Sequence, residues 1–172
     1  AKVFTCFARH QILHISHVQK TKKGRKKMAK RKTSKDTELA GLEVLSNGLL
    51  VRKSNMEIVG IHGCADKNDL RHLIIPEGVK SIGEKVFSRH DEIISISFPE
   101  SLEKIGNLSF WMCNGLQKVN IPKNVKIIKA SAFQGCSNLM EVKLNKGLLI
   151  VEDYAFAGTE VAKLDLPESV RV

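Results

Sequence analysis

The sequence lacks the patterns that mark most membrane proteins and enzymes. In its 172 residues, no run approaches the roughly 20 apolar residues that a membrane-spanning helix needs. It contains no G-x-S-x-G nucleophile elbow, Walker loop, G-x-G-x-x-G turn or H-E-x-x-H pair. We therefore expect a protein that is not an enzyme, with no catalytic residues and no cofactor.

Cysteines and aromatic residues are also scarce. The four cysteines, Cys6, Cys64, Cys113 and Cys136, form no C-x-x-C pair, so neither a disulfide scaffold nor a zinc ribbon is expected. We predict no metal site. Aromatic residues make up only 5% of the chain, so the core must be mostly aliphatic.

The net positive charge is confined to the N-terminal part of the chain. Residues 1–40 hold 12 of the 28 lysines and arginines but only two of the 18 acids, so the rest of the chain carries 16 of each sign. We interpret 1–40 as a basic extension, disordered or partly helical. Its run 20–35 has ten basic residues in sixteen and could contact nucleic acid or an anionic membrane, but it lacks aromatic residues for base stacking. A solvated tail, or sequence ahead of a start at Met28, stays open.

A period of 23 residues organises the chain from Leu70 onward. The array consists of units 70–92, 93–115, 116–138 and 139–160, followed by a partial unit, 161–172. Three units have 23 residues, the fourth has 22, and the fifth stops halfway. The incomplete fifth unit would leave apolar side chains uncovered, which favours a module within a longer protein.

The columns of this alignment predict stacked coils. Positions four and six of each unit are aliphatic or Phe between polar neighbours, which is the two-residue period of a short strand with one buried face. Position seven is proline in four of five units, which ends each strand. Position eighteen is Phe87, Phe110, Phe133 and Phe156. Since one unit cannot enclose its own apolar side chains, we predict a solenoid in which the four phenylalanines form one internal column.

The pattern L-x-x-[LIV]-x-[IL]-P-x-x-[VL]-x-x-I-G-x-x-[AVS]-F-x-x-C resembles the BspA-like (Treponema-type) leucine-rich repeats over Leu70–Val172. This chain departs from the pattern in a few places: Lys129 and Glu152 replace glycine, and Asn145 replaces proline. The resemblance implies an α/β repeat solenoid with a parallel strand ladder on one face and short helical or turn segments opposite. It also implies that Cys113 and Cys136 are small core residues, and we expect both to be buried free thiols.

The resemblance implies a function as well. The family is largely found on bacterial and protist cell surfaces, where members are implicated in adhesion. We therefore expect a non-enzymatic recognition module of a cell-surface or secreted adhesion protein, although the chain shows no signal peptide. The alternative is a cytoplasmic protein-interaction scaffold whose basic tail contacts nucleic acid or anionic membrane.

Residues 41–69 lead into the array. Segments 48–53 and 56–63 flank Ser54 and Asn55 and are typical of two short hairpin strands. We expect a hairpin that caps the open apolar end before Leu70.

The strand positions that face solvent are the predicted binding surface for a protein or a glycan. Positions three and five supply ten residues to this strand face: His72, Ile74, Ser95, Ser97, Lys118, Asn120, Glu141, Lys143, Lys163 and Asp165. The surface lacks the Trp, Tyr and Arg side chains that usually anchor interfaces. An ordinary solvated sheet face is the competing interpretation, and weak or avidity-assisted recognition fits the small area.

Overall fold

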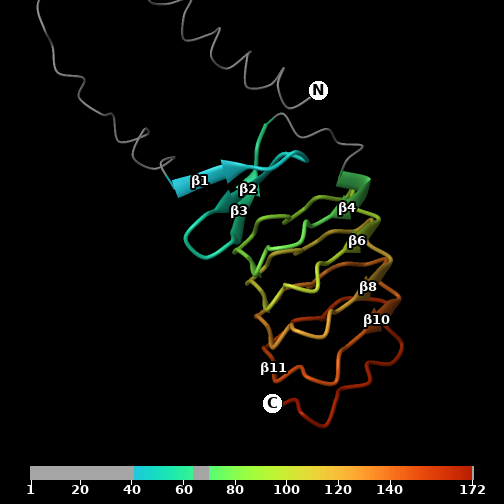
Figure 1. The fold of residues 1–172 in the computed structure, drawn as a ribbon. Helices are drawn as coiled ribbons and strands as arrows, with labels where there is room; N and C mark the ends of the chain where they lie inside the picture. The colour runs from blue at the N-terminus through green and yellow to red at the C-terminus, as the bar shows by residue number, and fades with distance from the viewer. Residues whose placement is uncertain (1–40, 64–69, 172) are drawn as a thin grey trace, which may run out of the picture. The chain divides into compact units, whose positions relative to one another are not determined.

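The structure is a computed structural model and describes residues 41–63 and 70–171. The basic extension predicted over 1–40, with its run 20–35, lies outside the described residues, as do Cys6 and Cys64. The array itself is a stack of coils that descends from the green to the red end of the chain (Figure 1).

Each of the first four units has a three-residue strand at positions three to five, with position four pointing inward. These strands form a four-stranded parallel sheet in the order β10-β8-β6-β4. Their bounds are β4 His72–Ile74, β6 Ser95–Ser97, β8 Lys118–Asn120 and β10 Glu141–Lys143. Each strand pairs with the one exactly one unit away, for example His72 with Ser95. The parallel ladder expected from the repeat is therefore present.

A second sheet lies on the opposite side of the coils (Figure 1). Its strands, in the order of pairing, are β1 Leu42–Val44, β2 Leu49–Arg52, β3 Glu57–Ile61, β5 Ser81–Ile82, β7 Lys104–Ile105, β9 Ile127–Ile128 and β11 Ile150–Val151. Strands β1, β2 and β3 pair antiparallel, while β3 pairs with β5 in parallel. The hairpin thus adds directly to the edge of the first coil, and its buried residues Leu49, Val51 and Ile58 join the core.

Two features differ from the expected α/β solenoid of five strands. Among residues 41–63 and 70–171, α-helical conformation is limited to Leu70 and Arg71, because the side opposite the ladder is built from two-residue strands and turns. The segment 161–166 of the fifth unit forms no strand. Further along that unit, Arg171 makes an isolated parallel bridge with Ile150 of the fourth unit. The described residues therefore form a β-solenoid, and its ladder has four strands.

The return segment of each coil forms a third ladder, which we call the loop ridge. It comprises residues 85–89, 108–112, 131–135 and 154–158. Nine backbone N–H groups donate to carbonyl groups of the next coil at 2.7–3.1 Å, for instance Phe87 N to Ser109 O. The first and last residue of each segment have φ between 53° and 74°, although six of these eight residues are not glycine. The cross-coil hydrogen bonds hold these residues in a conformation that costs about 1–3 kcal/mol each when isolated.

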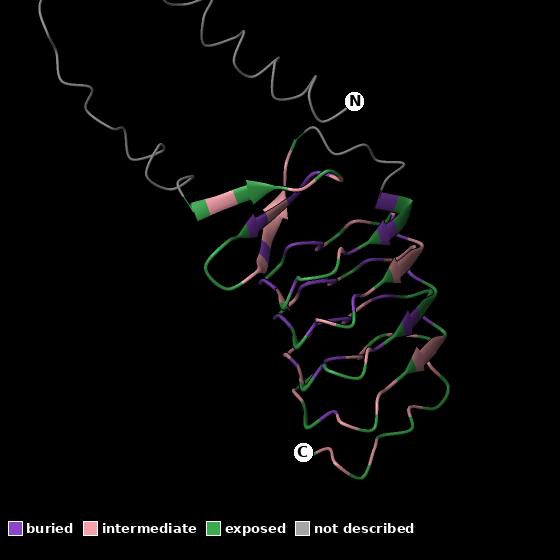
Figure 2. Ribbon diagram, in the orientation of Figure 1, coloured by how far each residue is buried: buried purple, intermediate pink, exposed green. Residues whose placement is uncertain are grey.

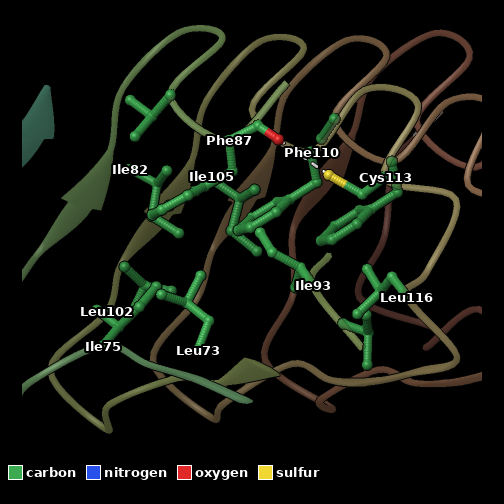
Figure 3. Packing of buried hydrophobic residues seen from close by; sticks show 14 of the residues in the cluster. Leu73, Ile75, Ile82, Phe87, Ile93, Leu102, Ile105, Phe110, Cys113 and Leu116 are labelled. Carbon is green, nitrogen blue, oxygen red and sulfur yellow. Dashed lines mark hydrogen bonds between the residues drawn. The ribbon is translucent and has the colours of Figure 1, made fainter. Parts of the chain in front are cut away.

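The four phenylalanines form the internal column that the repeat predicts. Successive ring centroids from Phe87 to Phe156 are 5.1, 5.2 and 5.3 Å apart, and the ring planes are within 9° of parallel. The rings and the aliphatic residues around them make one continuous core (Figure 3), and burial follows the inner side of the coils (Figure 2). Both Cys113 and Cys136 are buried free thiols, as expected.

Candidate functional site

The strand face is the outer surface of the ladder β4-β6-β8-β10. Eight of its ten predicted residues lie on these strands and form two columns along the stack. The first column is His72, Ser95, Lys118 and Glu141, and the second is Ile74, Ser97, Asn120 and Lys143. The structure brings these eight together on one side of the sheet. Lys163 and Asp165 are exposed in the fifth unit, which makes no ladder bond, so they lie outside the ladder.

Neighbouring side chains of the first column interact with each other. The imidazole Nδ1 of His72 lies 2.8 Å from the hydroxyl of Ser95. One carboxylate oxygen of Glu141 is 3.1 Å from the ammonium of Lys118, and the other is 3.0 Å from that of Lys143. Such exposed pairs add little to stability. They do bring the side chains of Lys118, Glu141 and Lys143 together on β8 and β10.

These contacts set the charge of the face. Hydrogen bonds from Lys143 and Lys118, together with their charges, lower the pKa of Glu141. In the fifth unit, Asp165 accepts a hydrogen bond from Lys163 at 2.7 Å and raises the pKa of that lysine. Both shifts favour the charged form, the carboxylate of Glu141 and the ammonium of Lys163. The β8–β10 half of the face is therefore ionic, whereas the β4–β6 half carries two serines, a histidine and Ile74.

Ile74 is an apolar element of the strand face. Its side chain is 63% exposed at the edge strand β4, where Asn47 of the hairpin donates a hydrogen bond to the Ile74 carbonyl at 2.8 Å. An exposed isoleucine in the half of the face that carries hydroxyl and imidazole groups can contact a ligand through apolar atoms while those groups supply polar ones.

Sequence reasoning missed a second group of interface-type residues. The only tryptophan and the only tyrosine of the chain, Trp111 and Tyr154, both lie on the loop ridge. The guanidinium carbon of Arg89 lies 4.7 Å from the centroid of the Trp111 ring, a cation–π contact. These residues stand at positions sixteen, nineteen and twenty of the repeat, on the two sides of the buried positions seventeen and eighteen. Their aromatic and arginine side chains beside the inward phenylalanine were the signal in the sequence.

Two kinds of site are not found in the part of the chain that the structure describes. No group of three or more His, Cys, Asp or Glu side chains there is placed to hold a metal ion. No helix within the same residues has the length and apolar character required to span a bilayer.

The region that matches a known family includes the whole repeat array. The profile of the family described as "BspA type Leucine rich repeat region" matches residues 59–172, in six copies. The chain belongs to this family. Leucine-rich-repeat families of this kind are generally non-enzymatic modules that bind proteins. The repeat array is therefore a recognition module.

Solved structures agree on the fold. A leucine-rich repeat protein of Bacteroides ovatus is 31% identical, with a TM-score of 0.56 over 58% of this chain and 26% of its own. The leucine-rich repeat protein of T. pallidum is 34% identical, with a TM-score of 0.53 over 55% of this chain and 45% of its own. A protein of Bacteroides capillosus, 23% identical, shares the fold over 71% of this chain and 89% of its own, with a TM-score of 0.55.

The aligned region covers about a quarter and just under half of the length of the first two of these proteins. No curated protein matches the chain.

Proposed function

We propose that the repeat array is the recognition module of a cell-surface or secreted adhesion protein and binds a host or cell-surface protein or glycan through the strand face. The observation that carries the proposal is the two-column surface on β4, β6, β8 and β10. The backbone of these four strands is held by the ladder hydrogen bonds, so little backbone freedom is lost on binding.

The size and chemistry of the surface indicate the strength of binding. Four strands about 4.8 Å apart span only roughly 14 Å across the ladder. The strand face carries no Trp, Tyr or Arg, which are the usual anchors of tight interfaces. We expect weak single-site binding that becomes strong when several copies engage a surface at once. Display on a cell is one way to provide such multivalency.

The domain boundaries belong to the same proposal. Residues 41–69 act as the N-terminal cap, 70–172 as the recognition array and 1–40 as a separate basic extension. In this division, recognition depends on the array and not on the extension. Removal of 1–40 should leave strand-face binding unchanged.

The test is binding of biotinylated protein, made tetravalent on streptavidin, to panels of extracellular-matrix proteins and glycans. Lys118→Ala and Asn120→Ala should each lower the apparent affinity at least five-fold for any ligand found. Lys123→Ala is the matched control, because Lys123 is equally exposed but lies in the turn after β8 and pairs with Glu100. Blank panels, or ligand binding that both strand-face variants retain, would rule out strand-face adhesion.

A further inference from the structure

The loop ridge has a composition unlike the rest of the surface. Its twenty residues include no acid, and its only charged residues are Lys85 and Arg89. Its outward positions carry Leu108, Trp111, Met112 and Tyr154, of which Met112 is 38% and Tyr154 is 70% exposed. Aromatic residues, Met and Arg are the types enriched at protein interfaces, whereas Asp, Glu and Lys are depleted there.

Arg89 is held in place before any partner arrives. Its backbone N–H donates to the Trp111 carbonyl at 2.7 Å, and its guanidinium lies over the ring of the same residue. An arginine stacked in this way has already lost much of its side-chain freedom, so an added hydrogen bond costs less entropy. The ridge backbone is equally fixed, since its cross-coil bonds run through all four coils.

In the part of the chain that the structure describes, no carboxylate pairs with the guanidinium of Arg89. Among the described residues it makes no hydrogen bond or ion pair, unlike Lys85, which lies 3.0 Å from Glu84. Its planar fork of N–H donors fits a carboxylate bidentately while the face stays stacked on the indole. A carboxylate beside an apolar group would complement Arg89 together with the exposed edges of Trp111 and Met112.

We propose that the loop ridge is a second interaction surface, which binds an acidic–apolar peptide segment of a partner protein. The partner's carboxylate pairs with Arg89, and its adjacent apolar side chain packs on Trp111 and Met112. This surface is separate from the strand face, so the test of one binding proposal can fail while the other proposal stands.

Trp111 gives a direct readout, because it is the only tryptophan in the chain. The probe is the acetylated, amidated peptide Gly-Ser-Asp-Leu-Leu-Asp-Phe-Leu-Gly-Ser, compared with the same peptide in which asparagine replaces both aspartates. With excitation selective for tryptophan, we expect the acidic peptide to change the tryptophan emission. The change should saturate at a peptide concentration of about 1 mM, which is the weak end of specific binding. The asparagine peptide should bind at least ten-fold more weakly.

Variants and a competitor complete the test. Arg89→Gln should weaken binding at least five-fold, whereas Arg71→Gln, which removes another exposed arginine outside the ridge, and Lys118→Ala on the strand face should leave it unchanged. The proposal is overturned by an emission that does not saturate, by equal binding of the asparagine peptide, or by full binding to the Arg89 variant. Dextran sulfate that displaces the peptide at equal charge concentration would also overturn it, since charge alone would then suffice.

Discussion

At the scale of single residues, comparing the units column by column shows where a side chain is poorly suited to its buried position. Position seventeen is alanine in the third and fourth units and Ser109 in the second. The Ser109 hydroxyl is fully buried and has no hydrogen-bond partner among the residues that the structure describes. A buried polar group without a partner costs about 1–3 kcal/mol. Ser109 therefore marks a place where the sequence has not optimised the stability of the coil.

Replacing this hydroxyl should stabilise the protein. We expect Ser109→Ala to raise the free energy of unfolding by about 1 kcal/mol, as measured by urea denaturation. The matched control is Ser101→Ala, because the Ser101 hydroxyl accepts from Gly78 N–H and donates to the Val79 carbonyl, both at 2.9 Å. The control should be destabilised by a similar amount. A Ser109 variant less stable than the parent would contradict the assignment of an unsatisfied hydroxyl.

Gly106 occupies a position where two neighbouring coils approach closely. A Cβ atom there would lie 2.8 Å from the backbone carbonyl of Gly83 and in direct conflict with the carbonyl oxygen of Ile82. Gly106→Ala should therefore lower the free energy of unfolding by about 1–3 kcal/mol, the usual cost of overpacking. Gly60→Ala in the hairpin is the control, since its Cβ would meet only the Leu50 side chain at 3.6 Å. Equal stability of the two variants would show that the coils can move apart without cost.

At the scale of elements, side chains complete the turns of each coil across the stack. The thiol of Cys113 donates to the Phe87 carbonyl at 2.9 Å, and that of Cys136 donates to the Phe110 carbonyl at 3.1 Å (Figure 3 shows the first). Burial raises the pKa of both thiols, that of Cys136 to about 11 and that of Cys113 further, with the neighbouring Cys136 as a second cause. The folded state therefore favours the neutral, protonated thiol over the thiolate.

This linkage predicts a loss of stability at high pH. Because the folded pKa lies above the unfolded value of about 8.5, the stabilisation is complete below that pH and falls as the pH rises toward 11. We would compare urea midpoints at pH 7.5, 9 and 10.5 for a Cys6→Ser/Cys64→Ser parent and the same protein with Cys113→Ala/Cys136→Ala. The parent should lose more stability between pH 9 and 10.5. Parallel losses in the two proteins would assign the effect to other groups, such as lysines.

At the scale of the whole molecule, each coil contacts only its neighbours. The stability of such a stack is approximately a sum of unit and interface terms, so a unit can be removed if the columns stay aligned. Deleting 116–138 joins Gly115 to Leu139 and places every core column back in order. We expect a folded, less stable solenoid with a single unfolding transition by circular dichroism.

The control for this deletion removes half a coil. Deleting 116–127 brings polar positions onto the core columns, so this protein should show no cooperative transition. If both deletions behave alike, the stack does not depend on the 23-residue period, and the modular description of its stability is wrong.

The repeat period and its columns determined much of the fold. The alternation around position four predicts β4, β6, β8 and β10, and position eighteen predicts the stacked phenylalanines, because the two-residue period of a strand is set by local geometry. The hairpin strands β2 and β3 also follow from the sequence around Ser54 and Asn55. These features can be predicted from the pattern of apolar side chains alone.

Tertiary structure decided the features that depend on partners one coil away. Strands of two residues such as β5 have too little alternation to be recognised before they pair. The left-handed residues of the loop ridge, and the cation–π pair of Arg89 with Trp111, exist only because backbone bonds link residues 22 positions apart. The sequence therefore sets which side chains lie inside each coil. Stacking decides the conformation of the return segment and which side chains meet on the surface, because the cross-coil hydrogen bonds cannot be replaced by bonds within one coil.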